Sequence, residues 1–121
     1  MNNENVKLRI RNILDGFGLK PKKYLELLED FEENFNEIII LAKKSIDDLN
    51  QIKSLECILS IKGLSGNLGL ENTYIKSKDF IQSLKKNIDE KSLTNLEELQ
   101  IIFNQEIYKI RTNNIILSKQ S

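Results

Sequence analysis

The chain of 121 residues contains no histidine and no tryptophan, and it has only one cysteine and one proline. A single cysteine, Cys57, excludes an intrachain disulfide and any metal site built from several cysteines. Without histidine, ordinary zinc sites and Ser-His or Cys-His catalysis are also excluded. We therefore expect a protein with no metal site, no cofactor and no catalytic residues.

The chain also lacks an excess of charge of either sign, because 18 basic residues balance 18 acidic ones. This balance removes the electrostatic reason for binding nucleic acid or an anionic membrane. The longest apolar run, Ile38 to Ala42, is too short to span a bilayer, and the first dozen residues do not resemble a signal peptide. We expect one soluble, cytoplasmic domain over residues 1–121, with polar tails at about 1–5 and 118–121.

Scarce glycine and proline, with apolar residues at helical spacing, predict an all-α protein. A short amphipathic helix is expected over about 6–14, ended by Gly16 and Gly18. Pro21 suits the first turn of a second helix, expected over about 21–45.

Three further helices are expected over about 49–67, about 70–87, and from Ser92 to as far as Leu117. Asp47 and Asp48 are predicted N-caps of the first of these, and Gly66 and Gly69 its stop signals. The short connections imply antiparallel neighbours, hence an up-down-up-down four-helix bundle with a short extra N-terminal helix.

Apolar stripes give the expected core of this bundle. In the second helix the stripe is Tyr24, Leu28, Phe31, Phe35, Ile38 and Ala42. In the fourth it is Tyr74, Ser77, Ile81, Leu84 and Ile88, with Phe80 beside it. In the fifth it is Leu96, Leu99, Phe103, Ile107 and Ile110. The opposite side of the second helix is expected to be a solvated acidic face made of Glu26, Glu29, Asp30, Glu33 and Glu37.

The third helix has a second, outward stripe. At about 100° per residue, its core direction is set by Ile58, Ile61, Ser65 and Leu68, and Leu59 lies about 140° away from that direction. The outward stripe is expected to be Ile52, Leu59, Gly63 and Gly66, flanked by Leu55, Glu56 and Lys62. The candidate partner-binding residues are therefore Ile52, Leu55, Glu56, Leu59, Lys62, Gly63 and Gly66.

Gly63 is the unusual member of this stripe, since glycine inside a helix costs on the order of 1 kcal/mol relative to alanine. Its use would be access, because a partner can approach Leu59 closely where no side chain projects. The alternative is a close helix-packing contact at Gly63. Lys62 could supply positive charge to an anion held beside Leu59, whereas Cys57 is expected to be a small buried hydrophobe.

Residues 59–69 read L-S-I-K-G-L-S-G-N-L-G. This segment resembles H-[ST]-L-K-G-x-[AS]-x-x-[IL]-G, the core motif of histidine-containing phosphotransfer (HPt) domains. Leu59 stands where the family has its phosphoacceptor histidine, while Lys62 and Gly63 match the family's lysine and glycine. The similarity covers most of the chain, including the segment from Tyr24 to Phe31. It implies an HPt-like bundle with a receiver-binding surface centred on residue 59, and it does not imply phosphotransfer.

We therefore expect a pseudo-HPt module of a two-component phosphorelay that binds a response-regulator or hybrid-kinase receiver domain without accepting phosphate. One alternative is a phosphotransfer protein whose histidine was replaced by Leu59, in a natural paralogue or by engineering. Another is a homo-oligomer, such as a homodimer, in which Ile52, Leu55 and Leu59 pack against a second copy. Ser60 is a poor substitute acceptor because no activating base is near it in sequence. A pocket-containing enzyme is least favoured, since a tight bundle of this length has little room for a pocket.

Overall fold

Four helices make up the described part of the chain in the computed structural model, which describes the backbone of residues 20–120 and the side chains of residues 20–113. They are α2 (Pro21–Asp47), α3 (Gln51–Leu68), α4 (Glu71–Lys86) and α5 (Ser92–Gln120). The short helix expected over about 6–14, with its glycine stops, lies outside the described residues.

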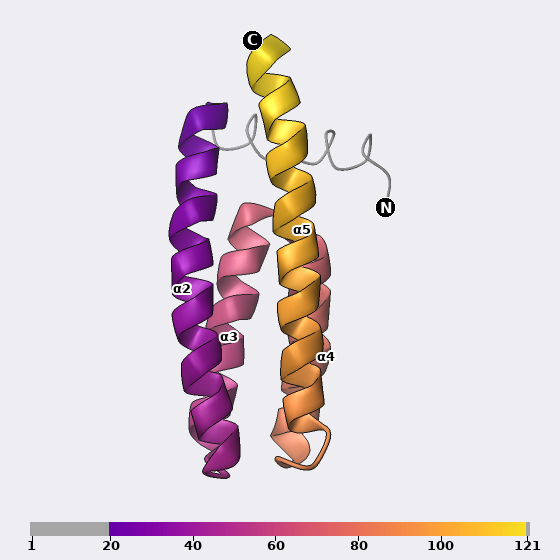
Figure 1. Ribbon diagram of the computed structural model, residues 1–121. Helices are drawn as coiled ribbons and strands as arrows, with labels where there is room; N and C mark the ends of the chain where they lie inside the picture. The colour runs from indigo at the N-terminus through magenta and orange to yellow at the C-terminus, as the bar shows by residue number, and fades with distance from the viewer. Residues whose placement is uncertain (1–19, 121) are drawn as a thin grey trace.

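Each helix packs against the next one in the chain, and α5 returns to pack against α2. Figure 1 shows the four helices side by side, with the longer α2 and α5 extending beyond the turn that joins α3 to α4. Because the connections between helices are short, successive helices run in opposite directions. The all-α fold and the up-down-up-down arrangement are therefore confirmed for the described residues.

Three phenylalanines form the aromatic centre of the core, where α2 meets α5. Phe35 stacks on Phe103 with ring centroids 3.7 Å apart and an interplanar angle of 11°. Phe31 meets Phe103 edge-on at 5.4 Å. These contacts bury three large apolar rings between α2 and α5, so this cluster fixes one helix against the other.

The predicted stripe of α2 is correct except at one position. Ile39 is in the buried core, whereas Ile38 is only partly buried and packs against the core from its side. Steps of three and four residues both suit a period of 3.6, so the spacing alone could not choose between them. The predicted acidic face of α2 is exposed along its whole length.

The other stripes are largely confirmed. All five predicted residues of α5 are buried, and in α4 Ser77, Ile81 and Leu84 are buried beside Phe80. Tyr74 is only half-buried, and Ile88 lies beyond the end of α4.

The predicted N-caps of α3 are wrong. Asp47 is the last residue of α2 and Asp48 directly follows it, while Asn50 caps α3 by accepting a hydrogen bond on Oδ1 from the Lys53 N–H at 3.0 Å. The helix therefore begins at Gln51, two residues later than predicted.

The turn between α2 and α3 explains the shift. Leu49 adopts a left-handed conformation with φ 57°. Its N–H donates to the Ile46 carbonyl at 3.0 Å, and the Asn50 N–H donates to the Ser45 carbonyl at 2.8 Å. This pattern ends a helix and usually has glycine at the left-handed position, so a leucine there gave no sequence signal.

At the other end of α3 the predicted stop is correct at Gly69, which is left-handed with φ 74°. The Leu70 N–H donates to the Ser65 carbonyl at 2.8 Å, which closes the helix. Gly66 lies inside α3, three residues before this stop.

Both ends of α4 are bound by side chains from neighbouring helices. The buried Glu106 of α5 accepts the N–H groups of Asn72 and Thr73, both at 2.9 Å, and the Thr73 hydroxyl at 2.8 Å. At the C-terminal end, the Gln51 amide of α3 donates to the Leu84 carbonyl at 2.7 Å. A carboxylate at a helix N-terminus is favourable both as an acceptor and as a charge near the positive end of the helix dipole.

Candidate partner-binding face

The two faces of α3 differ sharply in exposure. Ser54, Ile58, Ile61 and Ser65 point into the bundle and are fully buried. Leu59 is 48% exposed on the opposite side. The predicted rotation of α3, with residue 59 directed to solvent, is therefore correct.

Ile52 shares this outward side and is 73% exposed, two turns before Leu59. Leu55 lies between them and is half-buried, packed against the edge of the core. These three residues give the first half of α3 an apolar outer surface. Large apolar side chains on a monomer surface are informative when they gather on one face in this way.

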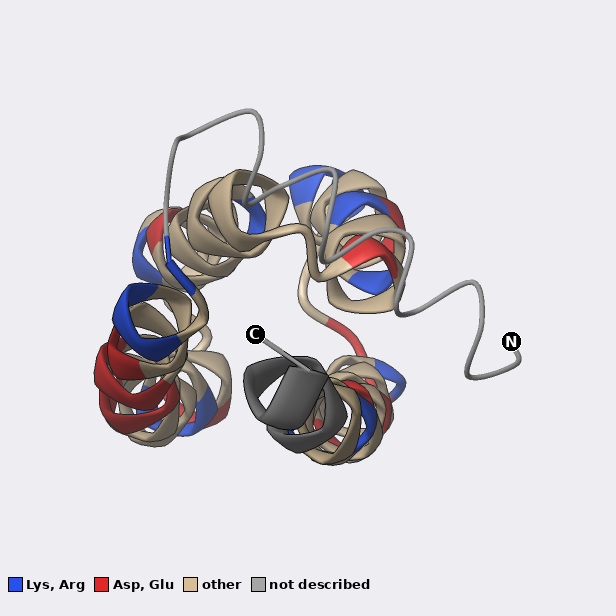
Figure 2. Ribbon diagram, turned by 90° about the horizontal axis from the view of Figure 1, so that it is seen from above, with Lys and Arg blue, Asp and Glu red and all other residues tan. Residues whose placement is uncertain are grey.

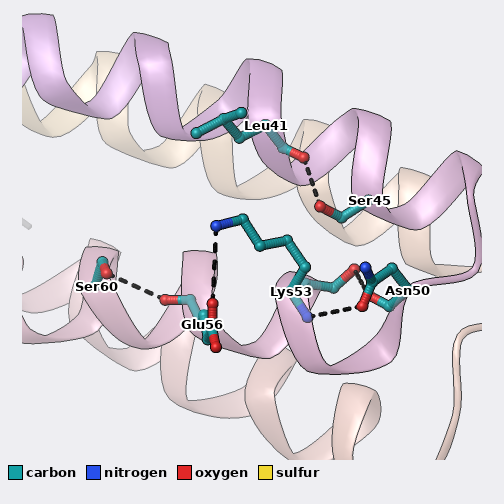
Figure 3. Close-up of polar contacts among 7 residues, drawn as sticks. Leu41, Ser45, Asn50, Lys53, Glu56 and Ser60 are labelled. Atoms are coloured by element: carbon teal, nitrogen blue, oxygen red, sulfur yellow. Dashed lines mark hydrogen bonds and ion pairs between the residues drawn. The ribbon is translucent and has the colours of Figure 1, made fainter.

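The polar side of this surface is made of exposed residues with weak contacts. Glu56 pairs with Lys53 at 3.8 Å, as Figure 3 shows. Both side chains are at least half exposed, so this pair adds little to stability. The Ser60 hydroxyl donates to the Glu56 carbonyl at 3.1 Å, also visible in Figure 3.

Gly63 stands one turn after Leu59, inside the 18-residue helix. It is exposed, and a Cβ built on it would meet no atom of the described residues within 4 Å. Among residues 20–113, the alternative of a close helix-packing contact at Gly63 therefore finds no support. In the described structure, nothing in the packing of α3 requires glycine at this position.

Gly66 differs from Gly63 although both are exposed. A Cβ at Gly66 would lie 3.3 Å from Cδ2 of Tyr74 on α4, tighter than an ordinary van der Waals contact. The Lys62 ammonium lies over the same tyrosine ring, 5.7 Å from its centroid. Tyr74 thus reaches the outer side of α3, whereas its spacing in the sequence predicts a place in the core stripe of α4.

Only the pairing of α3 with α4 could have revealed this contact. The connection after Leu68 is so short that the last turns of α3 must run beside the first turns of α4. We call the resulting surface the Leu59 face; it comprises Ile52, Leu55, Glu56, Leu59, Lys62, Gly63, Gly66 and Tyr74.

Charge is unevenly distributed around the bundle. Looking down the helices, Figure 2 shows acidic residues gathered on α2. The α4 helix, which borders the Leu59 face, carries four lysines and two acidic residues, namely Lys76, Lys78, Lys85 and Lys86 against Glu71 and Asp79.

Two observations concern metal-binding groups and the cysteine near the Leu59 face. Among the described residues no group of three or more histidine, cysteine, aspartate or glutamate side chains is arranged to hold a metal ion. Cys57 is buried on the inner side of α3, and this burial raises the pKa of its thiol, with Lys53 lowering that pKa and Glu56 raising it. A protonated, buried thiol is a poor nucleophile.

Within the same part of the chain, none of the helices is both long enough and apolar enough to cross a membrane. Comparison with known proteins finds no matching family model, curated protein or solved structure. Function must therefore be inferred from the residues of the Leu59 face themselves.

Proposed function

We propose that this protein is a pseudo-HPt signalling module that docks a receiver domain on the Leu59 face and does not accept phosphate. It acts by occupancy, competing with a true phosphotransfer protein for a receiver or holding that receiver in one state. The resemblance of residues 59–69 to the HPt motif motivates the proposal. The exposed position of Leu59 on α3 is consistent with it, because the family's histidine lies exposed on the corresponding helix.

The observation that carries the proposal is the open space at Gly63. Glycine in the middle of a helix is unfavourable by on the order of 1 kcal/mol relative to alanine. At Gly63 no neighbouring atom lies within 4 Å of the missing Cβ, so this cost has no compensation within the described structure. A partner that approaches Leu59 closely supplies the missing reason.

Phosphate transfer to this face is not expected, for a chemical reason. Leu59 has no lone pair to attack an aspartyl phosphate. The nearby Ser60 hydroxyl is engaged with the Glu56 carbonyl and has no histidine to remove its proton. Incubation with a phosphorylated receiver domain should therefore leave no acid-labile, alkali-stable phosphate on the protein.

The decisive experiment measures binding to the isolated receiver domains encoded in the source genome, by isothermal titration calorimetry. Leu59→Asp should leave the melting temperature nearly unchanged, because surface substitutions usually alter stability by less than about 0.5 kcal/mol. It should weaken receiver binding by about 2 kcal/mol or more, the size expected for a residue at the centre of an interface. Glu33→Gln on the acidic side of α2 is the matched control and should bind normally.

Two results would contradict this proposal. If Leu59→Asp unfolds the protein, residue 59 contributes to the core and the docking face is wrongly placed. If no receiver domain binds the wild-type protein, the receiver is not the partner.

The alternative of a replaced histidine makes a separate prediction, since Lys62 and Gly63 are still present. The Leu59→His variant should then take phosphate from a phosphorylated receiver domain. Comparison of the chain with its genomic coding sequence would show directly whether Leu59 is natural.

Self-association is the second candidate function, and the exposure of both Ile52 and Leu59 on one helix favours it. A second copy packed on this stripe would double the mass in solution. Light scattering at micromolar concentration distinguishes it from a receiver-binding monomer, and Leu59→Asp should return such a dimer to the monomer mass.

A further inference from the structure

Tyr74 connects two helices at the edge of the Leu59 face. It projects from α4, is half-buried, and its ring lies against the backbone of α3 at Gly66. The same ring lies under the ammonium group of Lys62, which is one turn before Gly66 on α3. One aromatic side chain therefore contacts both a glycine and a cation of the same helix.

Gly66 is what allows the ring to lie so close. A Cβ at this position would be 3.3 Å from Cδ2 and 3.4 Å from Cε2 of Tyr74. Any larger residue would push the ring away from α3. Gly66 thus differs in role from Gly63, since Gly66 accommodates a residue of this chain and Gly63 does not.

The ring restricts where the Lys62 ammonium can lie. A lysine side chain has four flexible carbons and loses substantial rotamer freedom when it is held in one place. A cation within about 6 Å of a tyrosine centroid is attracted to the face of the ring. Lys62 is half-buried, whereas Lys53 and Lys78 elsewhere on α3 and α4 are exposed. The contact with Tyr74 therefore favours one position of this positive charge, one turn along α3 from Leu59, before any partner arrives.

We propose that Tyr74 is a positioning residue that holds the Lys62 ammonium at the edge of the Leu59 face, so that this face accepts a partner surface with a carboxylate beside an apolar patch. The partner chemistry follows from the face itself, because Leu59 is an exposed apolar residue and Lys62, one turn later on the same helix, has its ammonium over the Tyr74 ring. This inference rests on the proposed function, since it names what the docked receiver must present.

The position of Lys62 can be tested without a partner. A ring current shifts the proton resonances of a methylene group held over an aromatic face, so the Lys62 Hε resonances of the wild-type protein should be displaced upfield. Tyr74→Phe should keep this displacement and Tyr74→Leu should abolish it. Gly66→Ala should reduce it, because the ring is pushed from α3. Hε resonances at ordinary lysine values in the wild-type protein would overturn the positioning role.

The effect on recognition is tested with the receiver domain that binds most tightly, at several salt concentrations. Lys62→Met should weaken binding and flatten its salt dependence, whereas Lys43→Met on α2, a matched loss of one charge, should do neither. Tyr74→Leu should weaken binding about two- to five-fold, the size of an exposed cation–π contact, and Tyr74→Phe should restore wild-type affinity.

The failures can be told apart. Receiver binding that is unaffected by Lys62→Met and Tyr74→Leu overturns this inference and leaves the proposed function standing. Absence of receiver binding by the wild-type protein overturns the proposed function and, with it, the assignment of the partner. A melting temperature for Tyr74→Leu equal to that of Tyr74→Phe shows that any difference in binding does not come from unfolding.

Discussion

Replacing Gly63 with alanine should stabilise this protein, although we propose that a partner approaches the chain at this position. Alanine is favoured over glycine inside a helix by about 0.8–1.0 kcal/mol, mainly because glycine has more backbone freedom to lose on folding. The new methyl group meets no atom of the described residues within 4 Å, so no steric cost from them offsets this gain. We expect Gly63→Ala to raise the free energy of unfolding by about 0.5–1 kcal/mol and Tm by roughly 2–5 °C.

Gly66→Ala is the matched control, because it makes the same chemical change in the same helix. Its methyl group would lie 3.3 Å from the Tyr74 ring, so part or all of the helical gain should be lost to displacement of that ring. Urea denaturation followed by far-UV circular dichroism measures both variants, and the slope of the transition should be unchanged. A destabilised Gly63→Ala variant, or equal effects at the two positions, would refute the reasoning.

Three other predictions concern buried groups. Phe35→Ala should lower the free energy of unfolding by about 3–5 kcal/mol, out of a total of about 5–15 kcal/mol, because Phe35 is fully buried and stacks on Phe103. A loss below about 1 kcal/mol in urea denaturation would contradict the packing of α2 on α5. Glu106→Gln should lower the free energy of unfolding by about 1–3 kcal/mol in the same measurement, because the buried carboxylate accepts two backbone N–H groups of α4. Glu97→Gln, on the exposed side of α5, should be nearly neutral. Burial raises the pKa of the Cys57 thiol in the folded state, so its neutral thiol contributes stability that is present below the pKa of the unfolded thiol and is lost as pH rises through the folded pKa. The free energy of unfolding should therefore fall more steeply above pH about 8.5 in the wild-type protein than in Cys57→Ala, and parallel curves would show that the thiol is not shielded.

The helices could be predicted because the apolar residues of α2 and α5 repeat with a clear helical period. Their rotation was correct for the same reason. The outward direction of Leu59 followed from the spacing of Ile58, Ile61, Ser65 and Leu68 within α3 itself. The predicted N-caps of α3 were wrong because of the turn at Leu49. Glycine, and not leucine, usually holds the left-handed position at a helix end, so the sequence did not indicate the turn at Leu49. The aspartates were therefore predicted as the N-caps of α3 in place of Asn50.

The contacts between helices were less accessible to prediction. Glu106 sits on the inner side of α5, where an acidic residue would be expected to interrupt the core. Its partners are backbone groups of α4, and backbone N–H groups have no signature in the sequence. The approach of Tyr74 to Gly66 likewise depends on how α3 and α4 pair. The outward stripe of α3 was found because glycine and leucine themselves mark it, whereas its aromatic edge comes from another helix.

The two ends of α4 have a consequence for how the bundle can be divided. Its N-terminal N–H groups are bound by Glu106, which is 33 residues or more away in sequence, and its C-terminal carbonyl at Leu84 is bound by Gln51. Leu70, the residue before α4, makes no side-chain capping hydrogen bond of its own. The boundaries of α4 are thus specified by residues on α3 and α5. A fragment that ends before Glu106 lacks the carboxylate that binds the first N–H groups of α4, so we expect the start of α4, and with it the Tyr74 contact with α3, to be less stable in such a fragment.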